Sequence, residues 1–198
     1  MAEGWEWIRS VEGSHDFEGG QLRIKSLPGN IWGGGSNPAK NILLTKLEEE
    51  NVCLTLKLSL NPSVHGEQAG LVLYLDDDHY CKVVREWIGS LKALAIVSAR
   101  EEEGKGKALK VEALEGKVVS LRMVKLGDRV VCFGCAESEE KFKLLSDTTL
   151  PKKEGAELKL TLVSAGAKGD VDHWAEFHSL TMEPIAENSA PLSFTQNK

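Results

Sequence analysis

The sequence has few aromatic residues, few prolines and no long apolar run. Aromatic side chains make up 6% of its 198 residues, and proline occurs six times. The longest apolar stretches, around residues 71–75 and 91–99, are far shorter than the ~20 residues that a membrane-spanning helix requires. The first residues also lack the apolar segment of a secretory signal. We therefore expect a cytoplasmic protein with no membrane partner.

The sequence also has no excess of positively charged residues. The chain carries 24 Lys and Arg against 30 Asp and Glu, which gives a formal net charge of −6. Proteins that bind nucleic acids need a positive surface to displace the counterions of the phosphates, so no nucleic-acid partner is expected. Hydrophobic residues, at 41%, are sufficient for one buried core. We expect a single domain at residues 1–183 and a C-terminal tail at residues 184–198, which lacks periodicity.

Cysteine is scarce, and the four cysteines form no recognisable metal or redox motif. They are Cys53, Cys81, Cys132 and Cys135. Cys132 and Cys135 have C-x-x-C spacing, but they lie in an apolar run typical of a strand, without the helix N-terminus that lowers the pKa of a thiol. No second pair stands at zinc spacing. We expect buried, inert thiols, no metal and no cofactor; redox or metal chemistry at these thiols is the alternative.

The sequence is instead rich in strict alternation of apolar and polar residues. Every second residue of the segment 52–60 is apolar, and the segment ends at an Asn-Pro pair. The same period recurs in 69–75, 81–83, 119–123 and 158–162, each bounded by Gly, Pro, Asn or Asp. No segment keeps helical spacing over the length of a typical helix. About a dozen short strands with turns every ~8–12 residues predict an all-β fold, a two-sheet antiparallel sandwich.

Several of these strands carry motifs that resemble one family. Residues 68–71 are Gln-Ala-Gly-Leu, and residues 80–86 have the spacing Tyr-x-Lys-x-x-x-Glu. Together with Trp5-Glu6-Trp7 and Ala175-Glu176-Phe177, they resemble the concanavalin A-like domain at the C-terminus of family-43 β-xylosidases and its stand-alone intracellular relatives, such as the fungal regulation-of-enolase protein. The resemblance covers residues 5–182. It implies a concanavalin A-like jelly roll with one concave sheet and carbohydrate recognition.

Strand parity predicts a set of polar side chains on one face of this sheet. Where the apolar half of two strands faces the core, the polar half faces the other way, and it contains Gln68, Tyr74, Lys82 and Glu86. Arg122 joins them if its strand shares that sheet. Planar polar groups and an aromatic ring suit the hydroxyls and the C–H face of a sugar, so this set is the candidate ligand site of a lectin-like module. The alternative is a solvated sheet face whose charges pair across strands.

Trp32 is a further candidate for this site. It lies in the glycine-rich loop 28–38, between a Pro-Gly-Asn turn and a second proline. An aromatic ring held by such turns is suited to act as a lid or a stacking platform over the concave sheet. The alternative is a ring packed onto the rim of the sandwich.

Support for catalysis is weaker than support for binding. A glycosidase needs two carboxylates ~5–10 Å apart, and the Glu-x-Asp-x-x-Glu run of concanavalin A-like glucanases does not occur. Only Glu86 is well placed to act as a catalytic carboxylate, so we favour the interpretation of a non-catalytic module. Two alternatives stay open: an intracellular protein-interaction or regulatory module that docks a partner on a sheet edge or loop, and a sugar-active enzyme that uses Glu86 with Lys82 or Arg122. The sequence leaves the oligomeric state open.

Overall fold

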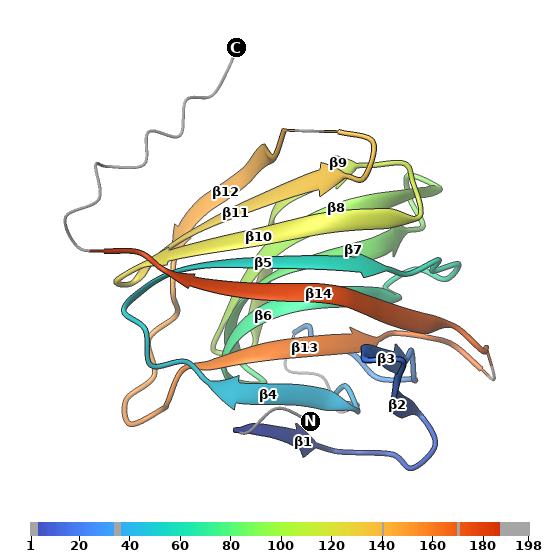
Figure 1. Ribbon diagram of the computed structural model, residues 1–198, viewed down its shortest axis with the longest axis horizontal. Coiled ribbons are helices and arrows are strands. Elements are labelled where there is room, and N and C mark those ends of the chain that lie inside the picture. Colours follow the sequence, from blue (N-terminus) through green and yellow to red (C-terminus); the bar gives the residue numbers. More distant parts are fainter. Residues whose placement is uncertain (1–3, 34–36, 140, 170, 187–198) are drawn as a thin grey trace.

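The computed structural model describes residues 4–33, 37–139, 141–169 and 171–186, which form fourteen strands in two antiparallel sheets (Figure 1). Sheet A has the order β1 (Trp5–Ile8), β4 (Ile42–Lys46), β13 (Lys159–Ala165), β6 (Gln68–Asp76), β7 (His79–Ile88), β8 (Ala93–Glu102) and β9 (Lys105–Ala113). Sheet B has the order β12 (Lys143–Thr149), β11 (Arg129–Ala136), β10 (Val118–Leu126), β5 (Asn51–Ser59), β14 (Trp174–Pro184), β3 (Gln21–Lys25) and β2 (His15–Glu18). Among these residues no helix is long and apolar enough to span a membrane.

The core lies between the two sheets and follows the alternation in the sequence. In β5, Leu54, Leu56 and Leu58 have no exposed surface, and the residues between them are half-buried. Leu71 and Leu73 of β6 belong to the same apolar cluster from the other sheet. Each leucine buried in this way contributes about 1.5–3 kcal/mol to folding. The predicted all-β, two-sheet antiparallel sandwich is confirmed.

The register of sheet A determines which side chains share its outer face. Cross-strand partners in an antiparallel sheet point to the same side. Across β6, β7 and β8 the outward rows are Gln68, Glu86 and Ala95; Gly70, Val84 and Val97; Val72, Lys82 and Ala99; and Tyr74, Tyr80 and Glu101. Polar rows therefore stand at both ends of this face, with small and β-branched residues between them.

The predicted domain and tail are described in part. β14 continues to Pro184, one residue into the predicted tail, and Ile185 donates its backbone N–H to the carbonyl of Asn51 in β5. Residues 187–198, which make up most of the predicted tail, lie outside the described residues. The division at residue 183 stays a prediction.

Candidate functional site

Of the six predicted site residues, four share the outer face of sheet A, Trp32 lies in the loop between β3 and β4, and Arg122 lies on the other sheet. Gln68 and Tyr74 lie on β6, and Lys82 and Glu86 lie on β7, all on the outward side. Arg122 lies on β10, which pairs with β5 and β11 in sheet B. The expectation that these strands share one sheet is therefore wrong for Arg122. Parity gives the side of a strand to which a residue points, but not the sheet to which the strand belongs.

The side chain of Arg122 packs against neighbouring side chains on the outer face of sheet B. Its guanidinium lies 3.9 Å from the ring centroid of Phe142, and its Nε donates to the hydroxyl of Thr55 at 3.0 Å. A cation over an aromatic ring at a partly exposed site contributes about 0.5–1 kcal/mol. Arg122 thus packs the outer face of sheet B and does not contribute to the predicted sugar site.

The loop between β3 and β4 covers much of the outer face of sheet A. Ile31 and Ala39 of this loop are buried in one apolar cluster with Val72 of β6 and Tyr80 of β7. Trp32 stays 39% exposed. Its ring lies so close to Gly106 of β9 that a Cβ on that glycine would stand 2.8 Å from the indole. β9 is the edge strand of sheet A, so both roles considered for Trp32, the lid over the sheet and the ring packed onto the rim, stay predictions.

Lys82 is the most unusual member of the predicted set, because its ammonium is almost fully buried. Nζ donates to Oε1 of Gln68 at 2.7 Å and to the carbonyl of Ile31 at 3.1 Å, and it lies 5.0 Å from the ring centroid of Trp32. Burial lowers the pKa of Lys82 from 10.5 to about 8, although the negative charges of Glu86 and Glu101 act in the opposite direction. Lys82 therefore anchors the loop to the sheet.

Tyr80 and Glu101 strengthen this anchor, and neither was among the predicted site residues. The Tyr80 hydroxyl contacts both the carbonyl of Ile31 and Oε2 of Glu101. The same carboxylate oxygen accepts the backbone N–H of Gly33 at 2.8 Å. Burial and the neighbouring carboxylate raise the pKa of Tyr80 well above its usual range. Tyr80 could have been predicted, because it shares the parity of Lys82 in the Tyr-x-Lys motif. Glu101 could not, because only the pairing of β7 with β8 brings it opposite Tyr80.

Tyr74 does not offer a free ring to a ligand. It is buried in the same cluster beneath the loop. Its hydroxyl donates to Asp77 at 2.9 Å, and Asp77 is held by two hydrogen bonds from the guanidinium of Arg9. Arg9 Nε also donates to the carbonyl of Ala39 at 2.6 Å. Tyr74 is therefore a second attachment point of the loop.

Glu86 is the member of the set with an uncommitted polar group. Within the described part of the chain its carboxylate forms no hydrogen bond or ion pair. Burial raises the pKa of Glu86, and the positive charges of Lys82 and His65 oppose that shift. Its neighbour Gln68 donates to the carbonyl of Gly66 at 3.0 Å. Glu86 and Gln68 therefore lie beside the loop that carries His65.

A polar pocket opens at this end of sheet A. Its volume is about 410 Å³, within the range of small-molecule sites. The side chains that can hydrogen-bond a ligand there are Asn30, Asn37, His65 and Lys168. His65 Nδ1 accepts the backbone N–H of Gly89 at 3.1 Å, which assigns the proton of the neutral ring to Nε2 and makes Nε2 a donor.

Two glycines allow the loops around this pocket to approach closely. A Cβ at Gly166 would lie 2.1 Å from the carbonyl oxygen of Gly66, and one at Gly29 would lie 2.7 Å from that of Pro38. Both have positive φ, of 94° and 130°, a region that other residues adopt only at a cost. Sequence reasoning missed this pocket because its four polar residues come from three loops that are distant in the chain. The only available signal was the concentration of Gly and Asn in those loops.

The outer face does not offer two uncommitted carboxylates in the described part of the chain. A glycosidase needs two carboxylates about 5–10 Å apart. Glu101 is engaged by the Tyr80 hydroxyl and by the backbone N–H of Gly33. Both oxygens of Glu67, at the entry to β6, are engaged, one by His173 and one by the backbone N–H of Ser63. Among the described residues this face therefore supplies one uncommitted carboxylate and no catalytic pair.

The cysteines are also not arranged for metal or redox chemistry in the described part of the chain. All four are free thiols. Cys132 lies opposite Met123 and faces the core, whereas Cys135 lies opposite Ser120 and faces outward. Burial raises the pKa of the Cys132 thiol to about 11, which disfavours the reactive thiolate. No group of three or more potential metal ligands occurs among the described residues.

Comparison with known proteins identifies relatives by sequence pattern and by fold. The chain matches the family model of the β-xylosidase C-terminal concanavalin A-like domain over residues 1–169, and it matches no curated protein sequence. The GH43 protein BlXynB from Bacillus licheniformis superposes with a TM-score of 0.81 at 17% identity, over 92% of this chain and 37% of that one. This chain thus spans little more than a third of that protein.

Two smaller proteins match over nearly their whole length. A protein of unknown function from Saccharomyces cerevisiae has a TM-score of 0.69 at 13% identity, over 92% of this chain and 98% of that one. The carbohydrate-binding module CBM66 from Bacillus subtilis has a TM-score of 0.58 at 14% identity, over 91% of this chain and 95% of that one. At these identities the likeness extends to the fold alone.

Proposed function

Because the chain belongs to the family of β-xylosidase C-terminal concanavalin A-like domains, we propose that it is a non-catalytic carbohydrate-binding module whose ligand site is the polar pocket at the end of sheet A. The family predicted from residues 68–71 and 80–86, and its concanavalin A-like jelly roll, are confirmed. The proposal moves the site from the middle of the outer face, where the loop covers Tyr74 and Lys82, to its open end.

The observation that carries the proposal is the chemistry of the pocket. Its amides, imidazole and ammonium come from Asn30, Asn37, His65 and Lys168, and together they offer both donors and acceptors. A sugar hydroxyl is at once a donor and an acceptor, so it pairs well with such a mixed set. Glu86 does not line the pocket; it lies opposite Gln68, which donates to the carbonyl of Gly66 in the pocket wall.

The relatives support the ligand class. One solved structure of the same fold is a carbohydrate-binding module, and others are GH43 proteins that contain this fold as about a third of their length. We extend the ligand class from those proteins to this chain as part of the proposal. It also includes a cytoplasmic location, which the four free thiols support, since thiols persist in reducing compartments.

The test is a glycan array followed by calorimetric titration of the best glycan. We expect Asn37→Ala and Lys168→Ala each to weaken binding about tenfold, because each removes one hydrogen bond of roughly 1–1.5 kcal/mol to the ligand. Both residues are exposed, so the variants should fold as the wild type does. Lys152→Ala, an exposed lysine outside the pocket, and Arg122→Ala, on sheet B, are the matched controls. A glycan that binds all four variants equally, or an array without any binder, would reject this site.

A further inference from the structure

Among the described residues, about half of strand β14 has no partner strand along one of its edges. β14 pairs with β5 from Glu176 to Pro184, but with β3 only from Trp174 to Phe177. Within the described part of the chain no strand pairs with 179–184 on the β3 side. Figure 1 shows β14 running well past the end of β3. The result is an open edge of six residues, about 20 Å long.

One backbone hydrogen bond shows which residues of β14 direct their N–H and C=O groups toward the open edge. The N–H of Ile185 donates to the carbonyl of Asn51 in β5 at 2.9 Å. In an antiparallel ladder alternate residues direct both backbone groups to the same neighbour. Leu180 and Met182 therefore point their N–H and C=O groups away from β5, toward the open side. Pro184 has the same phase, and its missing N–H is tolerated there because no described strand pairs with it on that side.

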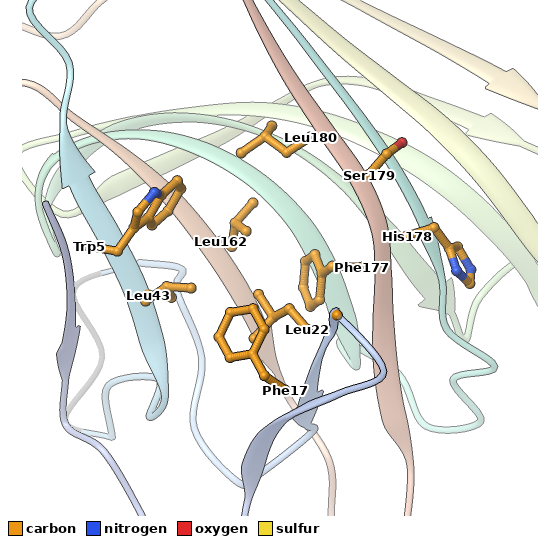
Figure 2. A pocket seen from close by; sticks show the side chains of 10 residues that line it. Trp5, Phe17, Leu22, Leu43, Leu162, Phe177, His178, Ser179 and Leu180 are labelled. Carbon is orange, nitrogen blue, oxygen red and sulfur yellow. The ribbon is translucent and has the colours of Figure 1, made fainter. Parts of the chain in front are cut away.

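An apolar cavity of about 290 Å³ adjoins this edge. Trp5, Leu43 and Leu162 of sheet A line one side, and Phe17, Phe177 and Leu180 of sheet B line the other (Figure 2). Figure 2 shows Trp5 and Leu180 pointing toward one another across it, whereas His178 points away. A β-bulge between Phe177 and Ser179 produces this arrangement, because the extra residue lets both Phe177 and Leu180 face the core.

Some side chains that point toward the core are exposed to solvent near this edge and cavity. Met182 lies opposite Leu54, which is fully buried, so both point between the sheets. Met182 nevertheless remains 40% exposed, and Phe17 remains 51% exposed. Apolar side chains of the core face that stay in contact with water show that the described residues cover this end of the core incompletely.

We propose that this edge binds an extended segment of a partner protein by strand addition. The segment pairs its backbone with Leu180 and Met182 and places one large apolar side chain in the cavity between Trp5 and Leu180. Six residues of edge provide far less than the ~1,200 Å² that a stable interface between two globular proteins buries, which favours a linear segment over a second copy of this chain. Glu183 faces outward beside the edge of a chain with net charge −6, so basic residues are favoured at the outward positions of the segment.

Selection from a displayed library of random heptapeptides tests the proposal, with Met182→Ala and Met182→Pro as a matched pair. Both variants remove the methionine side chain, but only proline removes the N–H that faces the open side. Because that N–H does not pair with β5, both variants should fold. We expect peptides with large apolar residues at alternate positions, which bind Met182→Pro about tenfold more weakly than Met182→Ala, the effect of one lost backbone hydrogen bond.

Amide hydrogen exchange of the wild type gives a second readout that needs no variant. The amides of Leu180 and Met182 should exchange fast in the free protein and become protected when a selected peptide binds. Those of Thr181 and Glu183, which pair with β5, should be slow in both states.

Four results would overturn the proposal. The first is that no selected peptide prefers the wild type to Met182→Pro, and the second is slow amide exchange at Leu180 and Met182 in the free protein. The third is a wild-type dimer that Met182→Pro abolishes. The fourth is a large gain in peptide affinity when residues 187–198 are deleted. The third would assign the edge to a second copy of the chain, and the fourth to its own C-terminal residues.

Discussion

The buried ammonium of Lys82 makes a prediction about how stability changes with pH. Methionine has nearly the same length and no charge, so Lys82→Met removes the titration while it keeps most of the volume. The variant also loses the hydrogen bonds to Gln68 and Ile31. The carbonyl of Ile31 keeps its contact with the Tyr80 hydroxyl. The cost of these lost bonds varies little with pH, so the pH-dependent part of the difference reports on the ammonium.

The sign and size follow from the two pKa values of Lys82. Burial lowers its pKa from 10.5 in the unfolded chain to about 8 in the folded protein. Between these values the unfolded chain binds a proton that the folded protein does not, so the stability of the wild type rises with pH. Applied from pH 7 to pH 9, the two values give an increase of about 1.4 kcal/mol in the wild type relative to the variant.

Urea unfolding of both proteins at a series of pH values measures this difference. Other groups, such as the buried Tyr80 and Cys81, titrate in both proteins and cancel in the comparison. We expect the two curves to diverge above pH 7, with the wild type gaining. Curves that stay parallel between pH 7 and pH 9 would refute the reasoning, because Lys82 would then keep its proton in the folded protein, as an exposed lysine does.

Gly166→Ala should lower the unfolding free energy by more than 2 kcal/mol and abolish glycan binding, whereas Gly169→Ala should lower it by about 1 kcal/mol. Both glycines have positive φ, but only Gly166 faces a backbone oxygen. Similar melting temperatures for the two variants would contradict this prediction. Arg122→Ala should cost about 1 kcal/mol through its ring contact and leave glycan affinity unchanged; reduced affinity would return Arg122 to the site. In the native protein iodoacetamide should alkylate the half-buried Cys53 before the buried Cys132, as mass spectrometry of peptides will determine; the reverse order would indicate an activated Cys132.

The sequence was sufficient to predict the class of fold and one face of one sheet. The alternation in 52–60 became the fully buried row of β5, and the parity of 68–74 and 80–86 correctly placed Gln68, Lys82 and Glu86 on a common face. These successes share a cause, since a period of two is a local property of the chain. The position of Arg122 depends on which strands pair, which is a property of the whole topology.

The pocket could not be predicted for a related reason. Asn37, His65 and Lys168 meet only because three loops converge at one end of sheet A. Their sequence neighbours are the usual residues of turns, and no spacing rule connects them. A lid over the sheet was one of the two roles predicted for Trp32, but the attachment of this loop above Tyr74 and Lys82 was hidden, because it depends on the carbonyl groups of Ile31 and Ala39. A carbonyl is present in every residue and leaves no trace in the sequence.

The way in which the sheet holds the loop between β3 and β4 has a consequence for how such a domain diversifies. Lys82, Glu101 and Arg9 bind the main chain of the loop, at Ile31, Gly33 and Ala39. Main-chain atoms are the same in every amino acid, so substitutions at exposed loop positions such as Asn30 and Asn37 leave this attachment intact. The surface beside the pocket is therefore free to change its chemistry between relatives or in a designed library while the scaffold that presents it stays constant.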